Sequence, residues 1–294
     1  QPALRGTWLT TTANDHLHSA ELIDASLTRL VDIGCNTVYI ESWKNGYTQF
    51  PSAVLQATIG VDRHPELGRN GRPDDLLEAT VLAAQRRGLL AVAWFEYGFM
   101  AAWKDTDNEL RRHDPTWLSR DRDGGVVAPN GFVWLNPLHP DVQDLIIGLL
   151  LEAVDRYDLD GVQLDDRLAW PHVEMGYDDY TVARYQAEHD GRSPPDNPRE
   201  KNWMRWRSEQ VDAVGLRIAT ALRQARPSLL VSLSPAIAPW AYDNYLLDWP
   251  AWVDWTDADD RPLWDTFIPQ CYRGDLAAFR QVWRQQRERG HAID

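Results

Sequence analysis

Hydrophobic residues recur along this chain with two alternating periods. Between residues 19 and 32 they are spaced as on one face of a helix, and Ser19 is a suitable N-cap. Thr37–Glu41 is instead a short β-branched run, which is typical of a buried strand. The alternation continues along the chain and predicts strands over residues 4–10, 37–41, 89–96, 162–165, 229–234 and 267–272, and helices over residues 19–32, 73–87, 140–157, 203–225, 242–252 and 275–289.

The order of these elements predicts parallel βα units. A sheet that binds a dinucleotide would carry a glycine-rich turn after its first strand, but residues 10–12 are threonines. The loops that follow the strands are long, and the connections from each helix to the next strand are short, as in a barrel with its site at the carboxyl face. We therefore predict an α/β fold, a TIM-type (β/α)8 barrel, over a single domain of residues 1–294. Residues 291–294 resemble the start of a seventh strand, so the barrel is expected to be truncated after the sixth βα unit.

Composition narrows the range of partners. The net charge of −14 argues against nucleic acid as a ligand, because nucleic-acid binders present a basic surface. No apolar run is long enough to span a membrane. The chain has 15 Trp residues; we expect roughly half in the core and several in a groove, where flat rings pack on sugars. Cys35 and Cys271 are expected to be free thiols, because the predicted fold separates them.

Acidic residues at the ends of predicted strands are the main chemical signal. Asp165 and Asp166 end one strand, Glu96 ends the strand before it, and Glu41 ends an earlier strand. In a barrel these ends meet at one mouth, where catalysis takes place. Strand alternation turns Asp165 toward the barrel axis, whereas Asp166 begins the loop. Glycoside hydrolysis needs one protonated carboxyl and a second group as nucleophile, base or charge stabiliser, so these acids predict a glycosidase.

Structural roles are the alternative for each of these acids. Asp165 and Asp166 could cap the next helix or pair with Arg167. Glu96 could be an ion-pair partner that supports the site, and for Glu41 this supporting role is favoured. The chain has no HExxH motif, no complete calcium loop and no Gly-x-Ser-x-Gly elbow. We therefore expect neither a metal nor a cofactor.

Short segments spread in order over nearly the whole chain form a recognisable set. They are Arg5-Gly6-Thr7-Trp8, Asn36-Thr37-Val38-Tyr39, Gly46-Tyr47-Thr48 with Pro51-Ser52, Trp94-Phe95-Glu96-Tyr97-Gly98, Trp134-Leu135-Asn136-Pro137, Asp160-Gly161 with Asp165-Asp166, Gly176-Tyr177-Asp178, Ser232-Leu233-Ser234-Pro235, and Gln270 with Tyr272-Arg273. With these segments the chain resembles the glycosyl-hydrolase-like family 10 (GHL10, formerly DUF187). The resemblance implies a TIM-type barrel that acts on glycan strands and is exported to the cell envelope or the extracellular space.

The resemblance also implies a substrate class and residue roles. Related proteins act on the glycan of bacterial peptidoglycan, and more distant barrels with an Asp-Asp strand end act on amino-sugar exopolysaccharide. The N-acetyl group of such a substrate can assist cleavage of its own bond. On this hypothesis Asp166 is the leading acid, Asp165 is the nucleophile or orients the acetamido group, and Glu96 is the alternative acid. The residues expected to contact the polysaccharide or oligosaccharide are Trp8, Glu41, Trp43, Trp94, Trp134, Asn136, Gln270, Tyr272 and Arg273.

Two positions depart from the family pattern. Arg167 stands where an aromatic residue or histidine is usual after the acid pair, and Glu41 stands where a neutral residue is expected. A permanent cation beside the aspartates favours their ionised form and hinders a general acid. Two other functions stay open. One is a carbohydrate-binding barrel without turnover, and the other is a lyase that leaves anhydro or unsaturated sugar ends.

Overall fold

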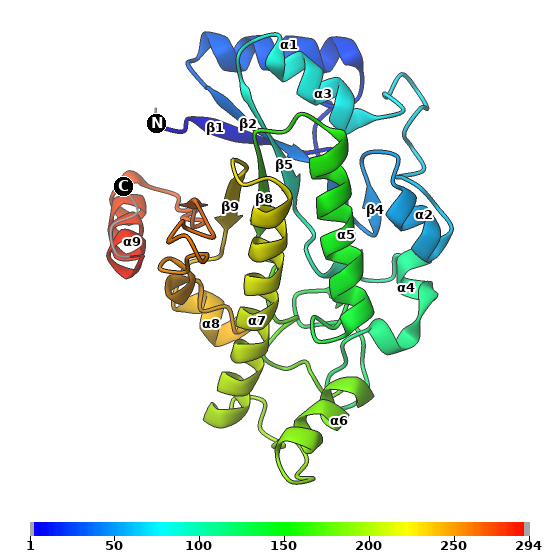
Figure 1. Ribbon diagram of the computed structural model, residues 1–294, viewed down its shortest axis with the longest axis vertical. Coiled ribbons are helices and arrows are strands. Elements are labelled where there is room, and N and C mark those ends of the chain that lie inside the picture. The colour runs from blue at the N-terminus through cyan, green and yellow to red at the C-terminus, as the bar shows by residue number, and fades with distance from the viewer. Residues whose placement is uncertain (1–2, 291–294) are drawn as a thin grey trace.

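Parallel strands form one sheet in the computed structural model, which describes residues 3–290 (Figure 1). The strands follow one another across the sheet in chain order, and every neighbouring pair is parallel. This is the strand order of a (β/α)8 barrel. The strands of the sheet are β1 (Gly6–Leu9), β2 (Thr37–Glu41), β5 (Leu90–Phe95), β8 (Gly161–Asp165), β9 (Leu230–Ser234) and β10 (Thr266–Phe267).

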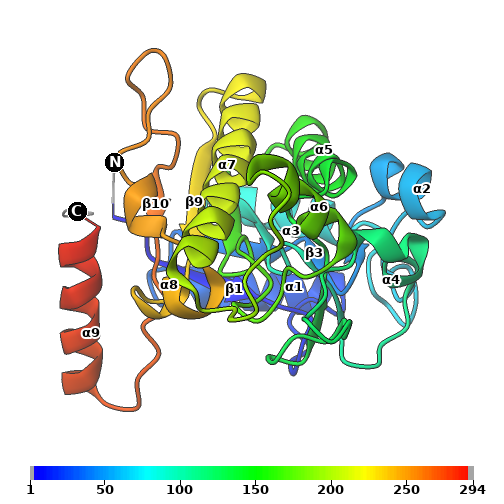
Figure 2. The ribbon, with the colours of Figure 1, turned by 90° about the horizontal axis from the view of Figure 1, so that it is seen from below.

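Helices cover the outer side of this sheet. α1 lies against α3, and α5 lies beside α7 in front of β8 (Figure 1). α9 stands at the edge of the molecule, next to β10 (Figure 2). The helices are α1 (Ala20–Asp32), α2 (Ala53–Ile59), α3 (Leu76–Gln85), α4 (Glu109–His113), α5 (Pro140–Arg156), α6 (Asp179–Glu188), α7 (Lys201–Ala225), α8 (Trp240–Tyr245) and α9 (Leu276–Arg289).

Local sequence signals define where these helices begin and end. The Ser19 side chain accepts a hydrogen bond from the backbone N–H of Leu22, which satisfies a free donor in the first turn of α1. Pro140 begins α5, at a position where no backbone N–H is needed. Gly34 follows α1 with φ +87°, in the left-handed region that glycine tolerates. The predicted helix from Ser19 to Asp32 is therefore confirmed, with Ser19 as its cap.

The two faces of the sheet have different surroundings. Val162 and Leu164 pack into the main core beneath the helices. On the opposite face, Tyr39 and Trp94 form a separate small cluster with the partly buried Trp8. Side chains alternate along a strand, so this second face points toward the barrel axis. The predicted orientation of the strand ending at Asp165 is confirmed, since its apolar residues face the helices.

Two stretches predicted as loops contain further structure. Residues 42–72 include α2 and an antiparallel hairpin, β3 (Trp43–Lys44) with β4 (Tyr47–Thr48). Residues 97–136 include α4, a 3₁₀ turn (Pro115–Trp117) and the antiparallel pair β6 (Met100–Trp103) and β7 (Phe132–Trp134). These elements are too short to show a clear hydrophobic period, so the sequence pattern missed them.

The last predicted elements need correction. The strand predicted over residues 267–272 ends at Phe267, and Pro269, which has no backbone N–H, follows soon after. The helix predicted over residues 242–252 is split into α8 and a 3₁₀ helix (Trp249–Trp252), because Leu246 takes a left-handed conformation with φ +55°. The predicted seventh strand at residues 291–294 lies outside the described residues.

The two cysteines and the length of the apolar helices are the remaining predicted features. Cys35 and Cys271 are free thiols, as predicted. Within residues 3–290, no helix is both long and apolar enough to cross a membrane.

Candidate active site

The acids at the carboxyl ends of β5 and β8 gather around one guanidinium group. Nη1 of Arg167 lies 3.2 Å from Oδ1 of Asp166, 3.5 Å from Oδ1 of Asp165 and 3.9 Å from Oε1 of Glu96. Because all three oxygens lie within 3.9 Å of the same nitrogen, no two of them are more than about 7.4 Å apart, and the three carboxyls share one site. The structure therefore brings together the three acids that the sequence singled out as catalytic.

Asp165 is held in one orientation by hydrogen bonds from three sides. Its Oδ2 accepts from Nε1 of Trp94 at 2.6 Å, and its Oδ1 accepts from Nε2 of Gln270 at 2.5 Å and from the backbone N–H of Asp166 at 2.7 Å. Burial raises the pKa of the Asp165 carboxyl, and the neighbouring Asp166 charge acts in the same direction. Asp165 is thus a fixed, buried carboxyl with little freedom to move.

Glu96 lies in an environment suited to a proton donor. Its side chain is only 17% exposed, and burial, followed by the charge of Glu41, raises its pKa to about 7. The positive charges of Arg167 and Lys44 oppose that increase. Its buried Oε2 has no hydrogen-bond partner among the described residues. A carboxyl with a pKa near neutrality and a free oxygen fits the requirements of a general acid.

Asp166 is the outermost of the three acids, with 25% of its side chain exposed. The half-buried Tyr245, at the end of α8, lies near it: burial raises the pKa of the Tyr245 hydroxyl, and the Asp166 charge adds to this effect. The Tyr245 hydroxyl also accepts a hydrogen bond from Nδ2 of Asn130 at 3.0 Å. Sequence reasoning missed Tyr245 and Asn130, because no strand-end position or motif marks either residue.

Glu41 proves to be a buried structural acid rather than a residue that contacts sugars. Its carboxylate accepts hydrogen bonds from the hydroxyl groups of Thr10 and Thr11 and pairs with Nζ of Lys44 at 3.0 Å. The backbone N–H of Thr11 also donates to it at 3.0 Å. These bonds tie the loop after β1 to the end of β2, and the buried carboxylate leaves little room for the predicted sugar contact.

Three further residues predicted to bind sugars are buried in the protein. Trp43 donates its indole N–H to the carbonyl of Gly98 at 3.0 Å, and Trp134 lies within the main core. Asn136 donates to Asp178 at 2.8 Å and also bonds to neighbouring backbone and hydroxyl groups. Their side chains are enclosed by protein, which leaves no exposed surface for the predicted sugar contacts of Trp43, Trp134 and Asn136.

The remaining predicted contacts lie at or near the barrel mouth. Trp8 stacks on Tyr39 with ring centroids 4.9 Å apart, and Trp94 is only 8% exposed and binds Asp165. Trp94 therefore positions an acid and offers little surface as a stacking platform. After β10, Gln270 contacts Asp165, whereas Tyr272 and Arg273 are exposed and free to meet a ligand.

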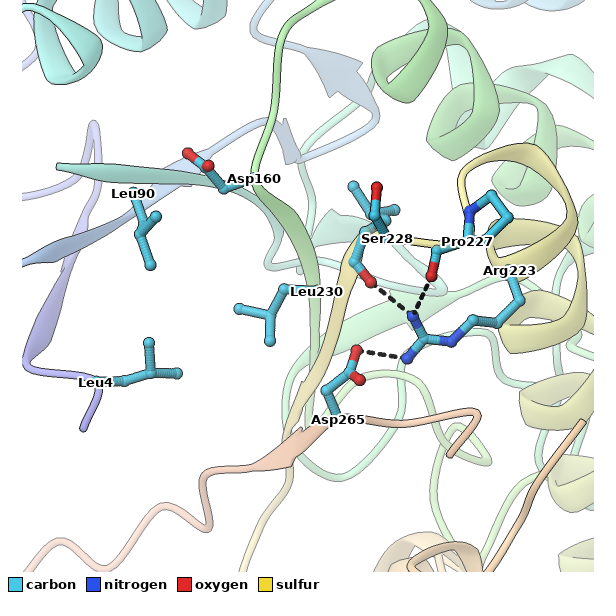
Figure 3. Close-up of a pocket in the computed structure, with 9 residues that line it drawn as sticks. Leu4, Leu90, Asp160, Arg223, Pro227, Ser228, Leu230 and Asp265 are labelled. Atoms are coloured by element: carbon cyan, nitrogen blue, oxygen red, sulfur yellow. Dashed lines mark hydrogen bonds and ion pairs between the residues drawn. The ribbon is translucent and has the colours of Figure 1, made fainter. Parts of the chain in front are cut away.

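A cavity of about 390 Å³ lies at the opposite end of the sheet, against the amino ends of the strands (Figure 3). Arg223 pairs there with Asp265 and donates to the carbonyl of Leu229 at 2.7 Å. Asp160 accepts the backbone N–H of Ala91 at 2.8 Å, so these polar groups are already partnered. In barrels this face usually serves stability, and the acids lie at the other face. Within residues 3–290, no group of three His, Cys, Asp or Glu side chains is arranged to hold a metal ion.

A parallel barrel sheet with carboxyls at the ends of β5 and β8 is the architecture of the glycoside-hydrolase class of barrel proteins. The chain belongs to the Glycosyl hydrolase-like 10 family, which matches residues 3–291. The proteins named glycosyl hydrolase DigH from Escherichia coli K12 and from Shigella flexneri are each 24% identical to it over an alignment 310 residues long that covers 92% of this chain. The match covers 65% of each relative, slightly less than two thirds of its length.

Solved structures support the barrel fold. The glycoside hydrolase domain of PgaB (BpsB) from Bordetella bronchiseptica superposes with a TM-score of 0.69 at 13% identity, over 100% of this chain and 82% of that chain. An alpha-galactosidase from Lactobacillus brevis superposes with a TM-score of 0.58 at 12% identity, over 98% of this chain and 32% of the other. At such identities the likeness concerns the fold alone, and the predicted TIM-type barrel is confirmed.

Proposed function

We propose that this protein is a glycoside hydrolase that cleaves glycosidic bonds in a bacterial amino-sugar glycan, such as the glycan strands of peptidoglycan. The observation that carries the proposal is the meeting of Glu96, Asp165 and Asp166 around Nη1 of Arg167. Membership of a glycosyl-hydrolase-like family supports the reaction class. Relatives named glycosyl hydrolases support the same reaction class, and the amino-sugar substrate rests on the family resemblance.

In the proposed mechanism, Glu96 protonates the leaving oxygen. Burial raises the pKa of Glu96 to about 7, so this carboxyl can carry a proton at neutral pH, whereas Asp166 lies closest to the Arg167 cation. This reverses the order of preference drawn from the sequence. Asp166, the more exposed aspartate, then acts as the base or nucleophile, or it stabilises positive charge on the sugar.

Asp165 is assigned an orienting role in this mechanism. Its two oxygens are occupied by Trp94, Gln270 and the backbone of Asp166, so it holds neighbouring groups in place. On a substrate with an N-acetyl group, the acetamido oxygen attacks the anomeric carbon as the bond to the leaving oxygen breaks. The leaving oxygen takes its proton from Glu96, and water then opens the cyclic intermediate. Asp165 supports that path indirectly, because it holds Trp94, Gln270 and the backbone of Asp166 in place.

Product analysis on purified peptidoglycan glycan strands tests the proposal. Mass spectrometry of the products is expected to show new reducing ends with wild-type protein. Glu96→Gln, Asp165→Asn and Asp166→Asn are each expected to lower turnover by about 100-fold or more. Asp123→Asn, at an exposed turn, is the matched control and is expected to keep wild-type turnover.

Other outcomes of the same assay contradict the proposal. Products with anhydro or unsaturated ends would identify a lyase, and glycan binding without any product would identify a binding barrel. Full turnover in both aspartate variants would remove these acids from the mechanism. A glycan of the envelope as substrate also implies that the protein is exported, which fractionation of cells that produce the full-length protein would test.

A further inference from the structure

We propose that Arg167 and Glu41 are opposing positioning residues that determine which carboxyl of the site holds a proton. The inference rests on the proposed function of the acids Glu96, Asp165 and Asp166. Neither Arg167 nor Glu41 reacts with the sugar in this view. Each acts through its fixed charge on the acid that does.

Arg167 is fixed at the centre of the acids by both its side chain and its backbone. Its Nη1 lies 3.2 to 3.9 Å from one oxygen of each acid. Its carbonyl accepts a hydrogen bond from the backbone N–H of Phe99 at 3.1 Å, which ties it to the turn that follows Glu96. A guanidinium group stays charged at every accessible pH, so it favours the ionised form of all three acids.

Glu41 supplies the opposite charge from the neighbouring strand. It pairs in register with Trp94 near the end of β5, and Glu96 is the first residue after that strand, close enough for the Glu41 charge to act on it. The Glu41 carboxylate is fully buried and held by the hydroxyl and backbone donors of Thr11 and by Lys44. Its negative charge is therefore fixed on the side of the barrel mouth where Glu96 lies.

The two charges act on Glu96 in opposite directions. After burial, the charge of Glu41 contributes most to raising the pKa of Glu96 to about 7, and Arg167 is the strongest influence that lowers it. With Glu41 alone the proton would be held too tightly to be transferred, and with Arg167 alone it would be lost at neutral pH. The other titratable or charged groups near Glu96 are Lys44, Tyr97, Asp166 and Tyr272, and Asp165 shares Nη1 of Arg167 with it.

A pair of variants with opposite expected effects tests the inference. Glu41→Gln keeps the size of the side chain and removes its charge, so the basic limb of the pH–rate profile is expected to move down by about one pH unit. Arg167→Gln is expected to move the same limb up by about one pH unit or more. Arg167→Lys keeps the charge and should stay closer to wild type. If the two residues had only a structural role, both variants would lower the rate, and the basic limb of the pH–rate profile would stay at its wild-type position.

A second readout does not depend on turnover. Titration of ¹³C-labelled glutamate carboxyls by NMR, with the Glu96 signal assigned from Glu96→Gln, should show the same opposite displacements. If Glu41→Gln fails to fold, Glu41→Asp replaces it: the shorter side chain draws the negative charge back, and the Glu96 midpoint is expected to fall by a smaller amount, still opposite to the effect of Arg167→Gln. Asp123→Asn serves as the control that leaves the midpoint unchanged.

The two proposals can fail independently. Absence of glycan turnover in the wild-type protein would overturn the proposed function, whereas the NMR titration would still report on Glu96. Displacement of the Glu96 midpoint in the same direction by Glu41→Gln and Arg167→Gln, or no displacement by either, would overturn the inference even in an active enzyme.

Discussion

Replacing Glu96 by glutamine is expected to stabilise the protein at alkaline pH while it removes activity. The glutamine amide resembles the protonated carboxyl in size and cannot ionise. The pKa of Glu96 rises from an ordinary value of 4.5 to about 7 in the folded protein, through burial first and the Glu41 charge second. Since one pKa unit corresponds to 1.36 kcal/mol, ionising Glu96 in the folded protein costs about 3 kcal/mol relative to the unfolded chain.

The sign of this effect defines the pH window. The folded state binds the Glu96 proton more tightly than the unfolded state does, so stability falls as pH rises from 4.5 to about 7. Below that window both states are protonated and the penalty is absent. Above it the penalty is complete. Glu96→Gln lacks this loss, and its advantage over wild type is expected to grow by about 3 kcal/mol between pH 4 and pH 8.

Urea unfolding of both proteins at the two pH values measures this change directly. The free energies of unfolding are compared as a difference between variant and wild type, so the titration of all other groups cancels. Glu109→Gln is the matched control: a hydrogen bond from Tyr47 lowers the pKa of Glu109, so its variant should lose stability relative to wild type as pH rises. An unchanged difference for Glu96→Gln, or one that favours wild type at high pH, would refute the argument that Glu96 is a buried acid with a raised pKa.

Three further predictions follow from contacts around the site. Gly98→Ala should lower the unfolding free energy by about 2–5 kcal/mol, because φ is +47° and the new Cβ would lie 2.4 Å from a main-chain carbonyl oxygen. Gly124→Ala is the control: φ is +86° but the space around it is open, so the loss should be only about 1–2 kcal/mol. Trp94→Phe removes the indole N–H that binds Asp165 and should lower turnover by about 10- to 100-fold, measured as kcat on glycan strands. Arg207→Met should destabilise the fold by about 3–5 kcal/mol in urea unfolding, since buried main-chain carbonyls lose their donors; a cost below about 1 kcal/mol would contradict this reasoning.

Much of the scaffold could be predicted from local pattern. The helix that begins after Ser19 and the strand Thr37–Glu41 agree with the structure because capping chemistry and β-branched runs act over a few residues. Side-chain alternation also placed Asp165 on the axis side of its strand, opposite Leu164. Short elements such as β6 could not be predicted, because four residues carry too little periodic signal.

The chemical state of the site depends on contacts between residues distant in the sequence. Trp94 and Gln270 lie 71 and 105 positions from the Asp165 that they bind, and no local pattern indicates either distance. Trp43 and Asn136 resemble sugar ligands in the sequence, yet folding encloses them.

The sequence by itself therefore determined the order of the strands and which strand ends carry acids, because both follow from local chemistry. Only the tertiary structure decided that Arg167 lies among three of those acids and that the pKa of Glu96 is raised to about 7. A pKa depends on burial and on the distances between charges, and these quantities exist only once the chain has folded.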